Sequence, residues 1–409
     1  MNWRFFTVWA LAAGLSACAG TQTGQATGRD TTPQVHQKTK QPRAETAQRV
    51  RTGAERLEAY LPLLDGKRVS LVVNQTSVVP ERSGARHVPL ADTLLSLGID
   101  VRSIMSPEHG YQGTAAAGKA VADSQDAATG IPIRSLYGQT HKPRPEWMKE
   151  ADVVVFDLQD VGTRFYTYLS TLYYLLQSCA EEGTDLIVLD RPNPNDTIDG
   201  PMLDPTYKSF VGIVPVPLLH GCTLGELATM MAGEGWTGDA PATPRLTVIT
   251  CTGWRHGQPY DLPIAPSPNL PTMQAIRLYP SLCLFEGTDI SVGRGTDFPF
   301  ACYGSPTMDG PFSFTPRASM HRGKTCHGID LRHVVTPRGF SLAYLLDAAR
   351  RSGGRRWITQ PSFFDKLAGT DRLRQQIAQG RTEAEIRTTW QADLAAYRDL
   401  RAHYLLYDE

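Results

Sequence analysis

The stretch that decides the fold is Arg68-Val-Ser-Leu-Val-Val-Asn74, a largely apolar and β-branched run that ends in a polar residue. Such a run suits a strand of a parallel sheet, because helices cover both faces of that kind of sheet and neither face needs polar side chains. Residues 153–158, Val-Val-Val-Phe-Asp-Leu, repeat the pattern even more strongly. Both segments therefore predict central strands.

Further along the chain, strand-like and helix-like segments alternate. Short apolar runs predict strands at 101–106, 134–137 and 186–189, and helical periodicity marks 90–97, 146–150 and 166–182. Thr223 with Glu226 three residues later forms a capping-box pattern, so a helix is expected over 223–234. This alternation predicts βαβ units and a Rossmann-like, doubly wound α/β sheet.

A Gly/Pro-rich stretch at 235–244 is the best candidate for a domain boundary. Beyond it we expect a strand at 246–250, a long loop-like region over 253–310, and helices at 341–351, 371–379 and 383–402. The chain is too long for one typical domain after its N-terminal region. We therefore expect a catalytic domain at 51–240 and a smaller α/β domain at 241–409 that completes a cleft.

The N-terminus has the pattern of a secretory signal. Met1 to Arg4 carries a positive charge, an apolar run too short for a membrane helix follows, and Leu15-Ser-Ala-Cys18 resembles a bacterial lipobox. We interpret 1–18 as a lipoprotein signal peptide with Cys18 as the lipidated residue, and the polar segment 19–50 as a flexible linker. An ordinary cleavage site with an incidental cysteine is the alternative. The expected location is the bacterial cell envelope, on the periplasmic face of the outer membrane.

Composition narrows the functional classes. The 41 basic residues balance the 41 acidic ones, which argues against a nucleic-acid partner, since such proteins usually carry a basic excess. Six cysteines follow Cys18, none in a Cys-x-x-Cys pair, so they are either disulfides or buried thiols. The sequence has no phosphate-binding loop, dinucleotide turn, nucleophile elbow or His-Glu-x-x-His pair. We expect neither a cofactor nor a bound metal.

Polar chemistry concentrates where three predicted strands end: Ser106-Pro-Glu-His-Gly110, Asp157-Leu-Gln-Asp-Val-Gly-Thr-Arg164 and Asp190-Arg-Pro-Asn-Pro-Asn-Asp196. Ligands of doubly wound sheets bind outside the carboxyl ends of the strands. Glu108 follows an apolar strand, so partial desolvation suits it to general-acid chemistry. It could equally cap a helix or pair with an arginine, and His109 beside it could be a hydrogen-bonding rim residue.

In the second motif, Asp157 and Asp160 precede Arg164, which could bind a substrate carboxylate or could hold the loop through an Asp–Arg pair. Tyr166 and Tyr168 could stack on a sugar face or belong to the core. A further acidic element, Leu284-Phe-Glu-Gly-Thr-Asp-Ile-Ser-Val-Gly-Arg-Gly-Thr296, carries Glu286, Asp289 and Arg294 among three glycines. Upstream of it, Pro266-Ser-Pro-Asn-Leu-Pro271 presents the amide of Asn269.

Taken together, these motifs resemble those of the NamZ-type exo-β-N-acetylmuramidases, a family long known only as a domain of unknown function. The resemblance rests on the strand-end motifs already quoted, on His220-Gly-Cys-Thr-Leu-Gly-Glu-Leu227, on the Asn269 and Glu286 loops, on Lys366-Leu-Ala-Gly-Thr370 and on Tyr404-Leu-Leu-Tyr407. It runs from about Gly66 to the C-terminus. Two positions depart from the family pattern as we know it: Leu219 stands where an arginine often precedes the histidine, and Val292 where a glutamate is common.

The resemblance implies release of N-acetylmuramic acid from the non-reducing end of peptidoglycan fragments during cell-wall turnover, with muropeptides or disaccharides as the molecules bound. It makes Glu108 the general acid/base, Glu286 or Asp160 its partner carboxylate, and Arg164 or Arg294 the ligand of the lactyl carboxylate. His109 would belong to the catalytic centre. The remaining substrate-binding candidates are Asp157, Tyr166, Tyr168, Asp190, Asn193, His220 and Asn269.

Two other functions stay open from the sequence. A metal-dependent envelope amidase or deacetylase could use His109, Asp157, Asp160 and His220, although these residues lack a known ligand spacing. A non-catalytic lipoprotein could instead bind muropeptides and deliver them to a partner. Turnover and its response to a chelator would separate the three.

Overall fold

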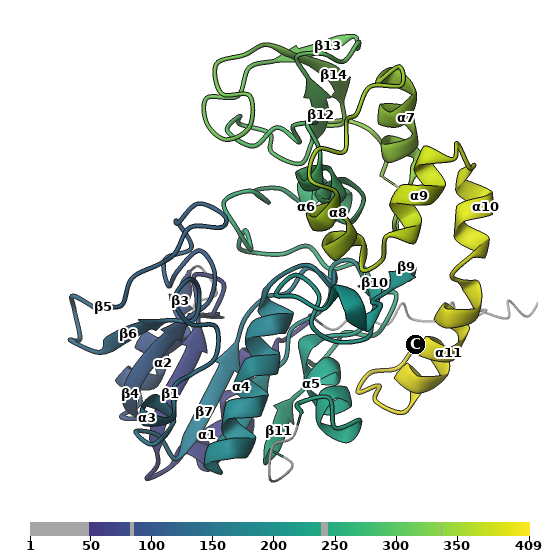
Figure 1. The fold of residues 1–409 in the computed structure, drawn as a ribbon. Helices are drawn as coiled ribbons and strands as arrows, with labels where there is room; N and C mark the ends of the chain where they lie inside the picture. The colour runs from purple at the N-terminus through teal and green to yellow at the C-terminus, as the bar shows by residue number, and fades with distance from the viewer. Residues whose placement is uncertain (1–48, 82–85, 239–243, 337) are drawn as a thin grey trace, which may run out of the picture. The chain divides into compact units, whose positions relative to one another are not determined.

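The computed structural model describes residues 49–81, 86–238, 244–336 and 338–409. Its central feature is a seven-stranded sheet with the order β11-β8-β7-β1-β4-β6-β5 (Figure 1). Its strands are β1 (Arg68–Val73), β4 (Asp100–Ser106), β5 (Ser124–Gln125), β6 (Pro132–Ser135), β7 (Val153–Asp157), β8 (Asp185–Leu189) and β11 (Leu246–Ile249). All neighbouring pairs are parallel except β5 with β6. The predicted Rossmann-like α/β fold is confirmed.

Helices cover both faces of this sheet. On one face lie η1 (Gly53–Glu55), α1 (Leu57–Leu64) and α2 (Leu90–Ser96), and on the other α3 (Pro145–Met148), α4 (Tyr168–Glu182) and α5 (Leu224–Gly233). Strand side chains alternate between the two cores: Leu71 packs with the α1 and α2 cluster, and Val72 with the α4 and α5 cluster. This two-sided burial is the physical reason for the continuous apolar runs in the sequence.

The order of the strands brings the strand-end motifs to one edge of the sheet. From β1 the chain passes to β4 and β6 on one side, and then returns to β7 and β8 on the other side of β1. The direction of winding therefore reverses between β1 and β7. Loops after the parallel strands leave the sheet at the same edge, where ligands of such folds bind.

A smaller C-terminal domain follows. It contains the antiparallel sheet β12 (Cys302–Ser305), β14 (Cys326–Asp330) and β13 (Phe312–Phe314), in that order. Its helices are α6 (Met273–Leu282), η3 (Cys283–Gly287), α7 (Ala343–Arg351), α8 (Pro361–Ala368), α9 (Arg372–Ala378), α10 (Glu383–Thr388) and α11 (Gln391–Ala402). Outside the two main sheets are β2 (Val78–Pro80), β3 (His87–Pro89), β9 (Ile198–Met202), β10 (Pro217–His220) and η2 (Pro205–Tyr207).

Three expectations about this second region were wrong. The stretch 253–310 is not a continuous loop, because α6 begins after the N-cap Thr272 and runs through Pro280. The expected helix 383–402 is two helices, with a break at Thr389 and Trp390 between α10 and α11. The strand expected to open the second domain, β11, instead pairs with β8 at the edge of the large sheet.

Other features of the sequence stand as follows. The capping box of α5 is present, with Thr223 and Glu226 exchanging hydrogen bonds. The six described cysteines are all buried, and none is paired in a disulfide. The signal peptide, Cys18 and almost all of the linker lie outside the described residues. Within the described ranges, no helix combines the length and apolar character needed to cross a bilayer.

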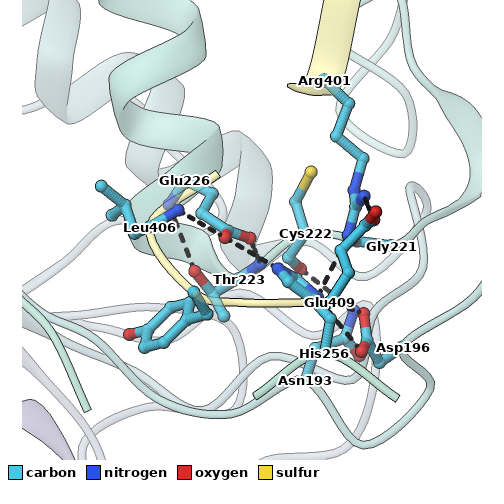
Figure 2. Close-up of polar contacts among 12 residues, drawn as sticks. Asn193, Asp196, Gly221, Cys222, Thr223, Glu226, His256, Arg401, Leu406 and Glu409 are labelled. Carbon is cyan, nitrogen blue, oxygen red and sulfur yellow. Dashed lines mark hydrogen bonds and ion pairs between the residues drawn. The ribbon is translucent and has the colours of Figure 1, made fainter. Parts of the chain in front are cut away.

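The C-terminal segment is held against the first domain by a buried charged cluster around His256 (Figure 2). The imidazole contacts Glu226 at 2.9 Å through Nε2 and Asp196 at 3.0 Å through Nδ1. The same Glu226 accepts a hydrogen bond from the Leu406 N–H, and Arg401 donates to the Gly221 carbonyl. The cluster therefore joins α5, the 256 loop and the last residues of the chain.

We expect this cluster to make the protein less stable as the pH rises from 6 to 8.5. Burial opposes the charge on His256, but hydrogen bonds and the charges of Asp196 and Glu226 raise its pKa from 6.5 to about 9. Its stabilisation is complete below pH 6.5 and is lost as the pH rises through about 9. Urea unfolding should show a fall of about 1–2 kcal/mol between the two pH values.

The His256→Gln variant should lose this pH dependence, while a His403→Gln control at an exposed position should keep it. An unchanged slope in His256→Gln would contradict the assignment.

Candidate active site

A cavity of about 930 Å³ lies between the carboxyl edge of the large sheet and the segments around α6, η3 and α8. Seven of the residues singled out in the sequence line it: Glu108, His109, Tyr166, Tyr168, Asn269, Glu286 and Arg294. The first domain supplies the loops after β4 and β6 and the residues that lead into α4. The C-terminal domain supplies the opposite wall, so the site is complete only when both domains are in place.

Glu108 follows directly after β4 and is held in a fixed orientation. Its Oε1 accepts a hydrogen bond from the Gly118 N–H at 2.8 Å, and its Oε2 accepts one from the Thr167 hydroxyl at 2.8 Å. The residue is nine-tenths buried. Among the described residues it neither caps a helix nor pairs with an arginine, and it faces the cavity as a catalytic carboxylate would.

The backbone around the cavity adopts conformations that L-residues rarely take. Four described non-glycine residues have φ in the left-handed region, and three of them line this cavity: His109 at 72°, Phe300 at 56° and Ser319 at 68°. Such strain costs free energy and collects at functional sites. At His109 it turns the chain sharply after Glu108, and the His109 Nδ1 lies 2.7 Å from the Ala115 carbonyl.

Glu286, in η3, is the second carboxylate of the cavity. Its Oε1 accepts a hydrogen bond from the Arg294 Nε at 2.9 Å and a second one from Nη2. The Arg294 guanidinium also lies 5.0 Å from the centre of the Phe300 ring. Burial opposes the charge on Arg294, but the Glu286 carboxylate raises the pKa of the guanidinium above its usual value. These two charges largely neutralise each other.

Tyr137, in the loop after β6, shows that both carboxylates face the same space. Burial, together with the charges of Glu108 and Glu286 and a hydrogen bond to Glu108, raises the pKa of its hydroxyl to about 12. The hydroxyl therefore stays protonated and donates to Glu108. Tyr137 belongs to no motif, and its place at the end of the predicted strand 134–137 is its one signal in the sequence.

Tyr137 also belongs to an aromatic wall that the sequence did not reveal. His141 stacks on Phe210 with ring centres 4.0 Å apart, and Tyr137 packs against both rings at 5.7 Å. Burial lowers the pKa of His141, so its ring is neutral near pH 7. Half-buried aromatic rings of this kind are suited to contact with the apolar face of a sugar.

Tyr166 and Tyr168 do not have the stacking role considered for them. Both rings are almost fully buried, and both hydroxyls donate to the Pro266 carbonyl. They form the floor of the cavity and fix the loop that carries Asn269. The Asn269 side-chain amide makes no hydrogen bond with another described residue, so it is free to bind a ligand.

Several other candidates lie beneath the site and have structural partners. Asp157 forms a fully buried ion pair with Arg191 at 2.5 Å, which ties the end of β7 to the end of β8. Asp160 accepts from the Gly162 N–H at 2.6 Å and lies 3.4 Å from His220. None of these residues lines the cavity. Of the two partner carboxylates proposed from the sequence, the structure therefore favours Glu286 over Asp160.

Asp190 and Asn193 are also structural. Asp190 accepts hydrogen bonds from Thr223, Gly225 and Tyr407, and burial raises its pKa to about 6. It thereby joins the end of β8 to α5 and to the C-terminal segment. Asn193 donates to the Cys222 carbonyl and holds the same region.

Arg164 is completely buried, and the expectation that it binds a substrate carboxylate was wrong. Its Nη1 donates to the carbonyls of Pro201 and Val216, and its Nη2 donates to that of Leu367. Burial lowers its pKa to about 9, so the guanidinium is still charged near neutral pH. The residue is a connector between the loop after β7, the β9–β10 hairpin and the end of α8.

The four residues of the metal-dependent alternative do not converge. His109 contacts a backbone carbonyl, Asp157 is neutralised by Arg191, and only Asp160 and His220 are near each other. Across the described ranges, no group of three or more His, Cys, Asp or Glu side chains could hold a metal ion. These four residues therefore do not fit a metal-dependent amidase or deacetylase.

Two carboxylates that face one cavity, together with hydrogen-bond donors and aromatic rings, are typical of a glycoside hydrolase. Comparison with known proteins identifies the family. The model of the NamZ exo-β-N-acetylmuramidase N-terminal domain matches residues 69–274, and that of the C-terminal domain matches residues 277–407. The chain belongs to the NamZ family of exo-β-N-acetylmuramidases, as its motifs predicted.

Individual relatives cover nearly the whole chain. It is 36% identical over 392 residues to the peptidoglycan β-N-acetylmuramidase NamZ of Bacillus subtilis, an alignment that spans 88% of this chain and 92% of the relative. Two crystal structures of DUF1343 family proteins from Bacteroides fragilis match 88% of this chain with TM-scores of 0.79 and 0.77. They are 42% and 28% identical to it, and 100% and 99% of their chains are covered.

The two departures from the family pattern have simple places in the structure. Leu219, where an arginine is common, is fully buried in β10. Val292, where a glutamate is common, lies between Glu286 and Arg294 in the sequence and also lines the cavity. A valine there leaves Glu286 as the single carboxylate that this loop contributes to the cavity lining.

We expect Arg164→Met to destabilise the protein rather than to weaken substrate binding. The substitution removes the guanidinium donor from three carbonyls, of which that of Val216 keeps another donor, the Leu203 N–H, so the free energy of unfolding should fall by on the order of 3 kcal/mol. Urea unfolding measures this. Arg68→Met, which removes an exposed ion pair with Asp152, should cost less than about 1 kcal/mol. A stable Arg164→Met protein with a raised KM would restore the binding role.

Proposed function

We propose that this protein is an exo-acting glycoside hydrolase that releases N-acetylmuramic acid from the non-reducing end of peptidoglycan fragments in cell-wall turnover. Its membership of the NamZ family supports the reaction class. The observation that carries the proposal is the placement of Glu108 and Glu286 in one cavity formed by both domains. Asn269 and the aromatic wall supply the polar and apolar contacts that a sugar needs.

In this mechanism Glu108 protonates the glycosidic oxygen as the bond to the anomeric carbon breaks. The Gly118 N–H and the Thr167 hydroxyl hold its carboxyl group in place. The hydroxyl of Thr167 can rotate to accept a hydrogen bond when Glu108 carries the proton and to donate when it does not. The Tyr137 hydroxyl remains a donor in both states.

Glu286 supplies the second carboxylate, which either attacks the anomeric carbon to form a glycosyl-enzyme that water then hydrolyses, or takes a proton from a water that attacks the anomeric carbon directly. Arg294 fixes its orientation through Oε1. Within the described chain no hydrogen bond engages Oε2, so that oxygen is available to the reacting centre. The anomeric configuration of the first product distinguishes a nucleophile from a general base.

The Glu108→Gln variant should lose catalysis while it keeps the fold. Removal of a general acid typically costs about 10²–10⁴ in rate, so we expect a fall of that size in kcat with a chromogenic N-acetylmuramide. Glu146→Gln, at an exposed position on α3, is the matched control and should retain full activity. A Glu108→Gln protein with near wild-type turnover would sink the assignment.

The reaction itself is tested with a synthetic muramide and a defined disaccharide, and the products are followed by mass and anomeric configuration. Release of free N-acetylmuramic acid supports the proposal. Loss of all activity in chelator would favour the metal-dependent amidase or deacetylase. Tight binding of the disaccharide without any product would favour the non-catalytic carrier.

We also propose that the mature protein is a lipoprotein anchored through Cys18 at the periplasmic face of the outer membrane. The support is the signal-like N-terminus with its lipobox pattern and the peptidoglycan substrate class of the family. The Cys18→Ala protein should move from the membrane fraction to the soluble fraction. Its turnover per molecule should be unchanged, because the cavity is built from residues far along the chain. Continued detergent-phase partitioning of Cys18→Ala would refute the anchor.

A further inference from the structure

The charges that line the cavity leave one cation without a partner. The lining contains two acidic side chains, Glu108 and Glu286, and two fully basic ones, Lys119 and Arg294. Arg294 is bound to Glu286 by two hydrogen bonds and covers the Phe300 ring. The Lys119 ammonium, by contrast, makes no hydrogen bond or ion pair with any described residue. It is therefore the cation of the lining whose charge no carboxylate of the described chain offsets.

The position of Lys119 next to the reacting centre is fixed by its neighbour. Gly118 donates its backbone N–H to Glu108 Oε1 at 2.8 Å, so the residue that follows begins within one peptide unit of that contact. The Lys119 N–H in turn donates to the Ala116 carbonyl, which closes the turn. Because Lys119 lines the cavity beside this turn, its long side chain can extend toward the sugar ring on which Glu108 would act.

A negative substrate needs such a cation in this cavity. N-acetylmuramic acid differs from N-acetylglucosamine by a lactyl ether, which carries a carboxylate. The charge of Arg294, the other cation of the lining, is already largely offset by the Glu286 carboxylate. An exposed ammonium gives up no protein contact when the ligand arrives, and beside the low-dielectric wall of the cavity it attracts a carboxylate more strongly than in bulk water.

We propose that the Lys119 ammonium binds the lactyl carboxylate and makes the site selective for N-acetylmuramic acid. This assignment rests on the proposed function and replaces both arginines considered from the sequence. Arg164 is buried beneath the loops, and Arg294 serves to orient Glu286. Lys119 is thus a specificity-determining residue, and its contribution depends on the charge of the substrate rather than on the chemistry at the anomeric carbon.

The test compares two proteins, wild type and Lys119→Met. Each is assayed with two substrates, a chromogenic N-acetylmuramide and the same compound with its lactyl carboxylate converted to a neutral amide. Hydrogen bonds to charged groups support a preference of wild type for the acid by about tenfold to hundredfold in kcat/KM. Lys119→Met should lose that factor on the acid, mainly through KM, and should hydrolyse the amide at the wild-type rate. The two changes should therefore not add.

Two further variants sharpen the result. Lys119→Arg keeps the charge and should retain most of the preference for the acid. Lys149→Met removes a largely exposed lysine that follows α3, at the amino end of β7, and should leave both substrates unaffected. An acid-to-amide ratio that is unchanged in Lys119→Met, or an equal loss on both substrates, would overturn the inference. If wild type releases sugar from neither substrate, it is the proposed function that fails.

Discussion

The buried guanidinium of Arg164 is the interaction on which the site depends. The Arg164 side chain extends from the loop after β7 and is completely buried. Its guanidinium donates to carbonyls of β9, of the segment before β10 and of α8. Because an unpaired buried guanidinium is very costly, these carbonyls must converge on it. Gly369 allows this convergence, since a Cβ there would clash with the guanidinium.

Arg164 is linked to the catalytic centre by a short stretch of the chain. Arg164 and Thr167 lie in the same loop, and Thr167 holds one oxygen of Glu108. The other end of the connection, Leu367, is itself part of the cavity lining. One buried cation therefore sets the position of the acid in the first domain relative to the wall that the C-terminal domain supplies.

The electrostatics of the cavity separate orientation from recognition. Arg294 and Glu286 form a pair whose net charge is close to zero, while Glu108 is held by neutral donors. Buried pairs elsewhere, Asp157 with Arg191 and the cluster around His256, follow the same rule that a buried charge needs a partner. Against this background, the unpartnered Lys119 stands out as a group kept for a ligand.

The sequence by itself determined the sheet, because apolar runs such as 68–73 and 153–157 are long, uninterrupted and buried on both faces. It also identified Glu108, Glu286, Asn269 and the family, since those motifs are local in the chain. The second domain was harder to predict, because α6 contains a proline and its strands are short, so their stability comes from packing rather than from periodicity.

Only the tertiary structure decided which polar residues face the cavity. Some buried residues are of the types that often act in catalysis, but their burial and their partners make them structural. They are Asp157, Asp160, Arg164, Asp190 and His220. Conversely, Lys119, Tyr137, His141 and Phe210 carry no motif and reach the site through the folding of their loops. Whether a charge binds a substrate or a neighbour depends on what lies within a few ångströms of it in space, and the order of residues along the chain does not contain that distance.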